Sequence, residues 1–346
     1  MLKRPGARGG RSEAGMKRQL EPTRVGFFGA GDISRLHCEA VRRSPGVELA
    51  GLWNRPGCPV VPDPSAKAEE YGCKMYGSAG ALAKDPSVSA IYVLTNMESH
   101  CELAKMAMAA GKHVYIEKPV GSSVAEIEEI EACAKKHGVV CMPGHNYLYE
   151  PDMQRMKLLL EEGKLGRPVQ LEMHYNIYHP DDVRGRLPGI IRQILTHHAY
   201  VALYLLGAPV SVTAMSSVIA GGAAGDKENL AMVLLKHTSG ALSMLQASFA
   251  ADDHTSDPWS FHIKLLGTEG GVRYSHNDWV RNEKHIVHSH TYCAYPFTIE
   301  AASKYFVREV LSEGRAPLSS MADAAMCQRI LEAAELAIKE ERHVRL

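Results

Sequence analysis

Short apolar runs and helical stretches alternate along the first part of the chain. An apolar run at 25–28 meets a glycine turn, which is followed by a helical stretch at 33–43 and a second apolar run at 47–53. This order predicts a βαβ unit, in which a helix connects two parallel strands. Because the alternation continues to residue 143, it predicts a doubly wound parallel sheet. The further strands are expected at 90–94, 113–117 and 139–143, and the further helices at 102–110 and 124–136.

The pattern changes after Pro151. A helical stretch at 153–162 is followed by long runs in which apolar and polar positions alternate, with turn signals at 238–240 and 267–271. Alternation of this kind predicts strands with one buried face. We therefore expect a second α/β domain with a large, mostly antiparallel open sheet that helices cover on one face. Its strands are expected at 169–178, 210–219, 230–236, 241–247 and 261–266, and its later helices at 189–206, 301–312 and 321–340.

These patterns divide the chain into three segments. Residues 1–23 carry charge and glycine but little that could be buried, so we expect a disordered leader, within which Met16 is an alternative start to Met1. We expect a dinucleotide-binding Rossmann domain over 24–145. A second α/β domain is expected over 146–346.

Composition and charge exclude several classes of partner. The chain has 346 residues, enough for two domains, and Lys+Arg equals Asp+Glu at 39 each. No overall field therefore attracts nucleic acid or an anionic membrane. No apolar run approaches the roughly 18 residues that a membrane span needs. The 8 cysteines form no CxxC pair, which is typical of a reduced, cytoplasmic protein rather than of a disulfide or zinc scaffold.

The glycine turn after the first strand predicts a dinucleotide site. Gly29 permits the tight turn, and Gly31 lets the backbone approach a pyrophosphate at the helix N-terminus. Ser34 stands at the position of the third glycine of such loops and is small enough for the helix to pack near the strand. Asp32 and Ile33, which open the helix, are expected to contact the same ligand.

The end of the second strand bears on the choice between NAD and NADP. Where a carboxylate would bind the ribose of NAD, the chain has Asn54 and Arg55. Arg55 is suited to pair with the 2′-phosphate of NADP, and Asn54 is suited to an unphosphorylated ribose. Both cofactors therefore stay open.

Several motifs resemble those of one known family. Segment 109–119, AAGKHVYIEKP, is similar almost letter for letter to the AGKHVxxEKP segment of the family of glucose-fructose oxidoreductase, inositol dehydrogenase and the rhizopine-catabolism protein MocA (Gfo/Idh/MocA). Segments 95–100, 144–151 and 197–209 are similar to further motifs of that family. The resemblance implies NAD(P)-linked redox chemistry on sugars or cyclitols. It also implies that the α/β domain over 146–346 serves substrate binding and oligomerisation, with a homodimer or homotetramer formed through the open sheet. It also implies cofactor contacts at Thr95, Asn96, His100, Glu117 and Lys118.

The chain departs from the family pattern near the expected site. Asn96 and Met97 replace Pro and Asn in the loop, and Leu148 replaces a common arginine. Gln193 stands where the family has an aspartate four residues before a histidine, and Tyr200 replaces a second aspartate. Glutamine cannot titrate, so it can only hydrogen-bond the histidine or a substrate hydroxyl.

Two residues are suited to the proton transfer that oxidation of a secondary alcohol requires. Lys118 is expected at the carboxyl end of a central strand, where open α/β sheets bind ligands and where desolvation lowers a lysine pKa. On a regular helix over 189–206, Gln193, His197 and Tyr200 would share a polar stripe. We therefore predict Lys118 and His197 as the proton-transfer groups. His198 is predicted to be a hydrogen-bonded core residue.

Further residues are predicted to line the substrate pocket. Tyr147 and Tyr200 would offer phenols to it, and Tyr175 opens a charged stretch that ends at Arg192. The three arginines at 184, 186 and 192 are suited to an anionic substituent, although charged loops are commonly only solvated. No metal site is expected, because nothing completes a ligand set around the histidine-rich run 284–290.

Three functions fit the sequence. The leading expectation is an NAD(P)-dependent oxidoreductase acting on a hydroxyl of a sugar, cyclitol or sugar derivative. The altered position Gln193 keeps open an NAD-dependent glycosidase, which the family also includes and which works by oxidation, elimination, hydration and re-reduction. A sensor that binds nucleotide without turnover is the third, and the retained Lys118 and His197 argue against it.

Overall fold

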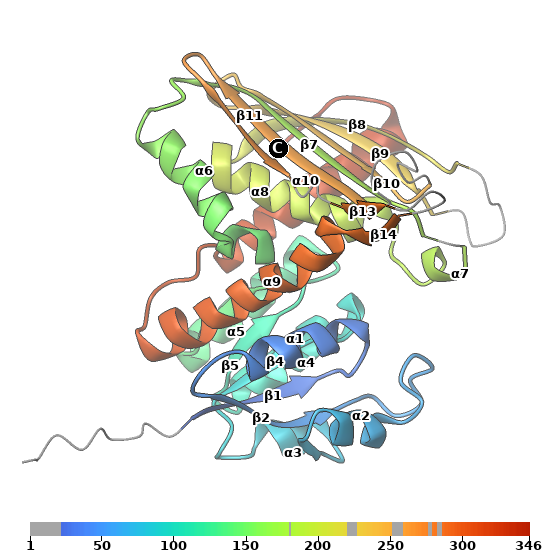
Figure 1. Cartoon of the computed structure of the whole chain (residues 1–346), viewed down its shortest axis with the longest axis vertical. Coiled ribbons are helices and arrows are strands. Elements are labelled where there is room, and N and C mark those ends of the chain that lie inside the picture. The colour runs from blue at the N-terminus through green and yellow to red at the C-terminus, as the bar shows by residue number, and fades with distance from the viewer. Residues whose placement is uncertain (1–21, 180, 220–226, 251–258, 276–278, 282–285) are drawn as a thin grey trace, which may run out of the picture.

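The chain forms two large sheets with helices between them, and a separate two-stranded hairpin (Figure 1). The structure is a computed structural model that describes residues 22–179, 181–219, 227–250, 259–275, 279–281 and 286–346. The expected leader lies outside the described residues, except for its last two positions. Thr23 already belongs to the first strand, β1 (Thr23–Phe28).

The first sheet is parallel and doubly wound, as predicted. Its strand order is β3-β2-β1-β4-β5-β6, and each strand runs parallel to its neighbours. β1 and β4 are central, and β4 and the last four residues of β1 are apolar and buried, because helices cover both faces of the sheet. The other strands are β2 (Val47–Trp53), β3 (Lys74–Met75), β4 (Ala90–Val93), β5 (His113–Ile116) and β6 (Cys141–Pro143), and the helices are α1 (Asp32–Arg42), α2 (Pro64–Glu70), α3 (Ala79–Ala83), α4 (His100–Ala109) and α5 (Val124–His137).

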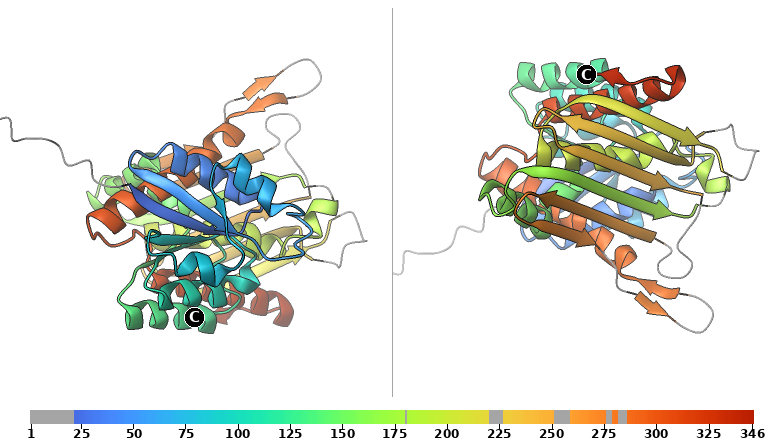
Figure 2. Two further views of the ribbon diagram at one scale, coloured as in Figure 1. Left: turned by 90° about the horizontal axis from the view of Figure 1, so that it is seen from below. Right: turned by 90° about the horizontal axis from the view of Figure 1, so that it is seen from above.

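The second sheet is mostly antiparallel, as predicted. Its order is β12-β11-β7-β10-β9-β8-β15, and only β7 and β10 pair in parallel. One face lies against helices, while Figure 2 (right) shows the other face bare. The elements are α6 (Pro151–Glu161), β7 (Pro168–Ile177), α7 (Asp181–Arg184), α8 (Thr196–Leu206), β8 (Pro209–Ser217), β9 (Leu230–His237), β10 (Leu242–Ser248), β11 (Trp259–Gly267), β12 (Gly271–Ser275), the hairpin β13 (Trp279–Arg281) and β14 (Ile286–Ser289), and β15 (Val344–Arg345).

The last two helices bind the two sheets together. α9 (His290–Tyr305) packs on α1, and its Ser303 shares a 2.8 Å hydrogen bond with the hydroxyl of Tyr92 in β4. α10 (Met321–Glu340) packs on α5, where Glu332 accepts a 3.1 Å hydrogen bond from the backbone of Val124. The C-terminal helices therefore lie between the two large sheets (Figure 1). The space that remains between the sheets is the candidate site.

Candidate active site

The glycine turn has the backbone that a dinucleotide loop requires. Gly29 has φ +106°, and a Cβ atom there would lie 2.8 Å from the carbonyl oxygen of Leu94, so only glycine fits. Gly31 precedes α1, and a Cβ atom there would meet nothing within 4 Å. The N-terminus of α1 thus opens onto free space, which suits an anionic group such as a pyrophosphate.

Asn54 holds this turn in place. Its side-chain oxygen accepts a 3.1 Å hydrogen bond from the backbone of Ala30, and its amide nitrogen donates to the carbonyl oxygen of Arg55. Asn54 is buried, whereas the side chain of Arg55 is exposed. Arg55 is therefore the better placed of the two predicted ribose contacts.

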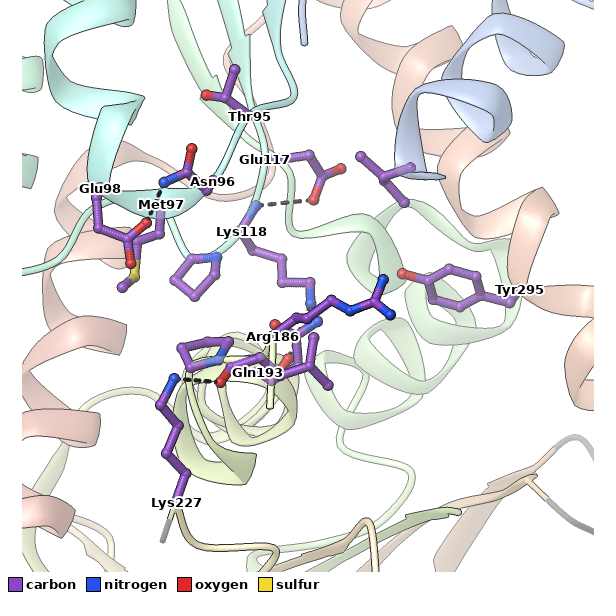
Figure 3. A pocket seen from close by; sticks show the side chains of 14 residues that line it. Thr95, Asn96, Met97, Glu98, Glu117, Lys118, Arg186, Gln193, Lys227 and Tyr295 are labelled. Carbon is purple, nitrogen blue, oxygen red and sulfur yellow. Dashed lines mark hydrogen bonds between the residues drawn. The ribbon is translucent and has the colours of Figure 1, made fainter. Parts of the chain in front are cut away.

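Two neighbouring cavities lie along the carboxyl edge of the first sheet. One, of about 320 Å³, lies between the two sheets and is lined by Glu117 and Lys118 after β5 and by Gln193 from the second half of the chain (Figure 3). The other, of about 410 Å³, lies beside the end of β2 and is lined by Arg55. Thr95 and Asn96 line both cavities, so a single extended ligand could occupy the two. Ile33, Met97, Glu98, Arg186, Lys227 and Tyr295 also line the first cavity.

Lys118 reaches across the first cavity from the end of β5. Its Nζ donates a 3.0 Å hydrogen bond to the backbone carbonyl of Gln193. Burial lowers the pKa of Lys118 to about 8, and the charge of Glu117 opposes this shift only in part. A lysine with this pKa can both accept and release a proton near neutral pH.

Glu117 is fixed beneath Lys118. Its Oε1 lies 2.8 Å from Nε2 of His37 on α1, and its Oε2 accepts a 3.0 Å hydrogen bond from the backbone of Lys118. Burial by itself would raise the pKa of Glu117, but the hydrogen bond and charge of His37 and the charge of Lys118 lower it below its ordinary value. The carboxylate therefore stays ionised at the floor of the cavity.

His100 lies behind the cavity wall. Its Nδ1 is 2.9 Å from the carbonyl oxygen of Pro119, and its Nε2 is 2.9 Å from that of Thr95. The ring is buried and lines neither cavity. His100 was predicted as a cofactor contact, and the structure instead places it between the loop after β4 and the segment after β5.

The helix expected over 189–206 is not regular. Residues Ile191–Leu195 form a π-helical turn, and α8 begins only at Thr196. The wider turn changes the register between Gln193 and His197, so the predicted polar stripe is wrong. Gln193 lines the cavity, whereas His197 is 1% exposed and does not line it.

His197 lies in an aromatic shell behind Lys118. Its Nδ1 is 2.7 Å from the hydroxyl of Tyr200, and its ring packs edge-on against Tyr147 and parallel to Tyr175. Burial, and then the charge of Lys118, lower its pKa well below the ordinary value. His197 is therefore neutral. Tyr147, Tyr175 and Tyr200 are likewise buried and do not line the cavity.

His198 faces the core, as predicted, but the expected hydrogen bonds are missing. Both of its ring nitrogens are buried without a hydrogen-bond partner within the described part of the chain. The ring packs on Tyr175 and Phe261. His198 thus fills volume in the core and carries a desolvated polar ring.

The predicted group of three arginines is divided. Arg192 makes a two-pronged ion pair with Glu335 of α10, at 2.6 and 2.8 Å, and also donates to the carbonyl oxygen of Ser122. Arg192 therefore connects α10 to the segment before α5. It was predicted to line the substrate pocket, and it does not line the cavity. Arg186 lines the cavity and points toward the hydroxyl of Tyr295, as Figure 3 shows. Arg184, on α7, does not line the cavity.

Two cavity residues escaped the sequence analysis. Lys227 precedes β9, and its Nζ donates a 2.8 Å hydrogen bond to the carbonyl oxygen of Leu187. Tyr295 comes from α9. Both reach the cavity from segments distant in sequence from Lys118, and neither belongs to a motif, so no local signal indicates them.

The described residues contain no group of three His, Cys, Asp or Glu side chains that could hold a metal ion. The side chains of the histidine-rich run 284–290 lie outside the described part. Within that part, no helix is long and apolar enough to cross a membrane.

Comparison with known proteins bears directly on this site. Residues 23–145 match the profile of the oxidoreductase family with an NAD-binding Rossmann fold, and residues 153–273 match the Gfo/Idh/MocA C-terminal domain. The chain belongs to the Gfo/Idh/MocA family. It is thus a member of a family of NAD-binding oxidoreductases; its first cavity lies where the Rossmann domain meets the C-terminal half of the chain, and its second cavity is lined by the Rossmann domain alone.

Relatives of this Gfo/Idh/MocA protein include several dehydrogenases. The inositol 2-dehydrogenase of Rhizobium meliloti is 28% identical over 258 residues, which cover 72% of this chain and 74% of that protein. The 4-carboxy-2-hydroxymuconate-6-semialdehyde dehydrogenase of Sphingobium sp. is 25% identical over 327 residues, covering 92% of this chain and 99% of that protein. The scyllo-inositol dehydrogenase of Lactobacillus casei, solved with NAD(H) and scyllo-inositol, has the same fold, with a TM-score of 0.82 at 16% identity and coverage of 94% and 99% of the two chains.

Proposed function

We propose that this protein oxidises a hydroxyl group of a sugar, a cyclitol or a derivative of one, with NAD or NADP as hydride acceptor. One observation carries the proposal. The amine of Lys118, whose pKa is about 8, lies in a cavity lined by both halves of the chain and adjoining a second cavity beside the end of β2.

The residues present fit a dinucleotide. The open space before Gly31 would accept the pyrophosphate, and Arg55 lines the cavity beside β2 where the adenosine half would lie. Thr95 and Asn96 would contact the ligand between the two cavities. When bound, the nicotinamide supplies the acceptor for the hydride.

Lys118 would accept the hydroxyl proton of the substrate. In its neutral form the amine has a lone pair for that proton, and the resulting ammonium ion is held by the carbonyl oxygen of Gln193 and the charge of Glu117. Gln193, Arg186 and Tyr295 line the same cavity and offer hydrogen bonds to further hydroxyls of a polyol. This arrangement suits a small, many-hydroxyl substrate.

A substrate panel tests this function. The full-length protein is incubated with NAD or NADP and with cyclitols, aldoses or glycosides, and the organic product is identified by mass spectrometry. The proposal predicts a product two hydrogens lighter than a polyol. A hydrolysed glycoside with no oxidised product would instead indicate the glycosidase.

We also propose that copies of the chain associate through the bare face of the second sheet. That face exposes apolar side chains on four adjacent strands, which is unusual for a surface in water. A homodimer or homotetramer would cover it, and light scattering of the purified protein measures this. Leu234→Lys should shift the particle mass to that of one chain. The exposed residues are Val169, Met215, Met232, Leu234 and Leu242.

We also propose that the protein is located in the cytoplasm. The cysteines that the structure describes are all free thiols, as expected in a reducing compartment.

A further inference from the structure

A network of hydrogen bonds runs from His197 to the backbone carbonyl of Tyr295, which can only accept. The hydroxyl of Thr298, on α9, donates a 2.7 Å hydrogen bond to the backbone carbonyl of Tyr295. A hydroxyl carries one proton, so Thr298 has no second proton to donate. Toward its other neighbour, Asn146, the Thr298 oxygen must therefore act as acceptor.

This fixes the orientation of the Asn146 side chain. Its amide nitrogen donates to Thr298, which turns its oxygen toward the hydroxyl of Tyr200. An amide oxygen cannot donate, so the hydroxyl of Tyr200 uses its only hydrogen to donate a 3.1 Å hydrogen bond to the side-chain oxygen of Asn146. The backbone N–H of Tyr147 also donates to the Tyr200 oxygen, at 3.3 Å.

The remaining partner of Tyr200 is Nδ1 of His197, at 2.7 Å. Because the Tyr200 proton already points at Asn146, Nδ1 must carry a proton and donate it. We propose that Tyr200 is a positioning residue that holds His197 in the tautomer protonated at Nδ1 and leaves the lone pair on Nε2. Use of that lone pair as a hydrogen-bond acceptor beside Lys118 rests on the proposed function.

Burial preserves this hydrogen-bond network. Asn146, Thr298, Tyr200 and His197 are each at most 1% exposed, so water is not available to replace a lost partner. His145 stacks on the ring of Tyr200, with centroids 4.2 Å apart. These contacts leave one arrangement of donors and acceptors from α9 to α8.

The phenol differs from a carboxylate in one respect that matters for chemistry. Both would accept the Nδ1 proton, but only a carboxylate would stabilise an imidazolium by charge. Burial raises the pKa of Tyr200 well above its ordinary value and lowers that of His197 well below, so the pair is neutral. His197 therefore orients and accepts hydrogen bonds, and Lys118 remains the group that changes charge.

Nitrogen NMR of the histidine rings tests the tautomer directly. The full-length protein is labelled with ¹⁵N-histidine, and the His197 signals are assigned by their loss in His197→Gln. A protonated Nδ1 and a bare Nε2 are expected. A protonated Nε2 with a bare Nδ1 would overturn the proposal, whatever the protein's activity.

A matched pair of variants at Thr298 tests the hydrogen-bond network at the end away from His197. Thr298→Val keeps the shape of the side chain and removes the hydroxyl, so Asn146 is no longer oriented, and Thr298→Ser keeps the hydroxyl. Thr298→Val should populate both His197 tautomers and lower kcat by about tenfold, as expected for one lost hydrogen bond, and Thr298→Ser should resemble the wild type. A Thr298→Val protein that shows only the wild-type tautomer would contradict the proposal that the hydrogen-bond network fixes the tautomer of His197.

The outcomes separate this proposal from the proposed function. If the wild type shows the Nδ1-protonated tautomer but oxidises no polyol, the tautomer assignment stands and the dehydrogenase proposal fails. If it oxidises a polyol while Nε2 carries the proton, only the assignment fails. Should Thr298→Val not fold, the wild-type spectrum still decides.

Discussion

The side-chain amine of Lys118 lies 3.0 Å from the backbone carbonyl oxygen of Gln193 and donates a hydrogen bond to it. Lys118 follows β5 of the Rossmann sheet, and Gln193 lies in the π-helical turn before α8. The contact therefore joins the two halves of the chain inside the cavity. It also holds the amine where burial lowers its pKa.

Turnover should depend on the protonation of Lys118. Only the neutral amine accepts a proton, and its pKa is about 8, so alcohol oxidation should rise with pH and level off above that value. Lys118→Ala should lower kcat by about 10²-fold or more while nucleotide binding persists. Lys118→Arg keeps the charge but does not titrate in this range, so it should lose the rising limb. Initial rates against pH provide the measurement.

Gln193→Asp should raise the pKa of Lys118. A carboxylate in the cavity beside the amine favours the ammonium form, so the rising limb of the pH profile should move to higher pH by about one unit. Gln193→Asn has no charge and is the control. An unshifted limb in Gln193→Asp would mean that this side chain does not face Lys118 during turnover.

Gly31→Val should abolish dinucleotide binding without unfolding the protein. The added side chain would fill the space before α1, where nothing else lies within 4 Å. Gly77→Val is the matched control, because a Cβ atom there also meets nothing and Gly77 lines neither cavity. Fluorescence titration with NADH and NADPH measures both variants. Equal binding by the two would place the dinucleotide elsewhere.

Arg55→Gln should weaken NADP binding more than NAD binding, by about tenfold, because it removes a cation from the rim of the second cavity. Asn54 is less informative, since its amide holds the glycine turn. The ratio of the two dissociation constants is the readout. A constant ratio would show that Arg55 does not meet the ribose.

His198→Leu should stabilise the protein by about 1 kcal/mol, because it removes two buried ring nitrogens that have no partners within the described residues. Burial lowers the pKa of His198 to about 3, so the unfolded chain binds a proton below about pH 6.5 that the folded protein does not. Stability therefore falls as the pH drops from 6.5, and less steeply in His198→Leu.

Denaturant unfolding at pH 7 and 5 measures this difference. His237→Leu is the control, because its ring nitrogens are hydrogen-bonded to Gly207 and Ser243 and their loss should destabilise the protein. A destabilised His198→Leu would indicate that the ring has a partner after all.

Local patterns predicted the fold because each signal was confined to one element. The glycine turn, the alternating runs of the second sheet and the segment ending at Lys118 correspond to β1–α1, β7–β11 and β5 in the structure. Strands of the Rossmann sheet are buried on both faces and appear as continuous apolar runs, whereas strands of the second sheet bury one face and alternate apolar with polar positions.

The geometry around His197 could not be predicted in the same way. Apolar periodicity cannot reveal a π-helical turn, because the turn changes register without changing composition. Nearly all of α8 is buried, so its polar positions did not mark an exposed face. The partners of Asn146 and Arg192, on α9 and α10, lie far away in sequence, and only the tertiary fold brings them together.

The most direct test is a measurement of reduced nicotinamide in a single turnover of the wild type and of Lys118→Ala. Each protein, in excess over a polyol found active in the substrate panel, is mixed with its preferred cofactor, and the absorbance of the reduced nicotinamide is followed. The account predicts about one reduced cofactor per polyol in the wild type, and a rate about 10²-fold lower in Lys118→Ala. Turnover of the substrate without net cofactor reduction, or an equal rate in Lys118→Ala, would contradict it.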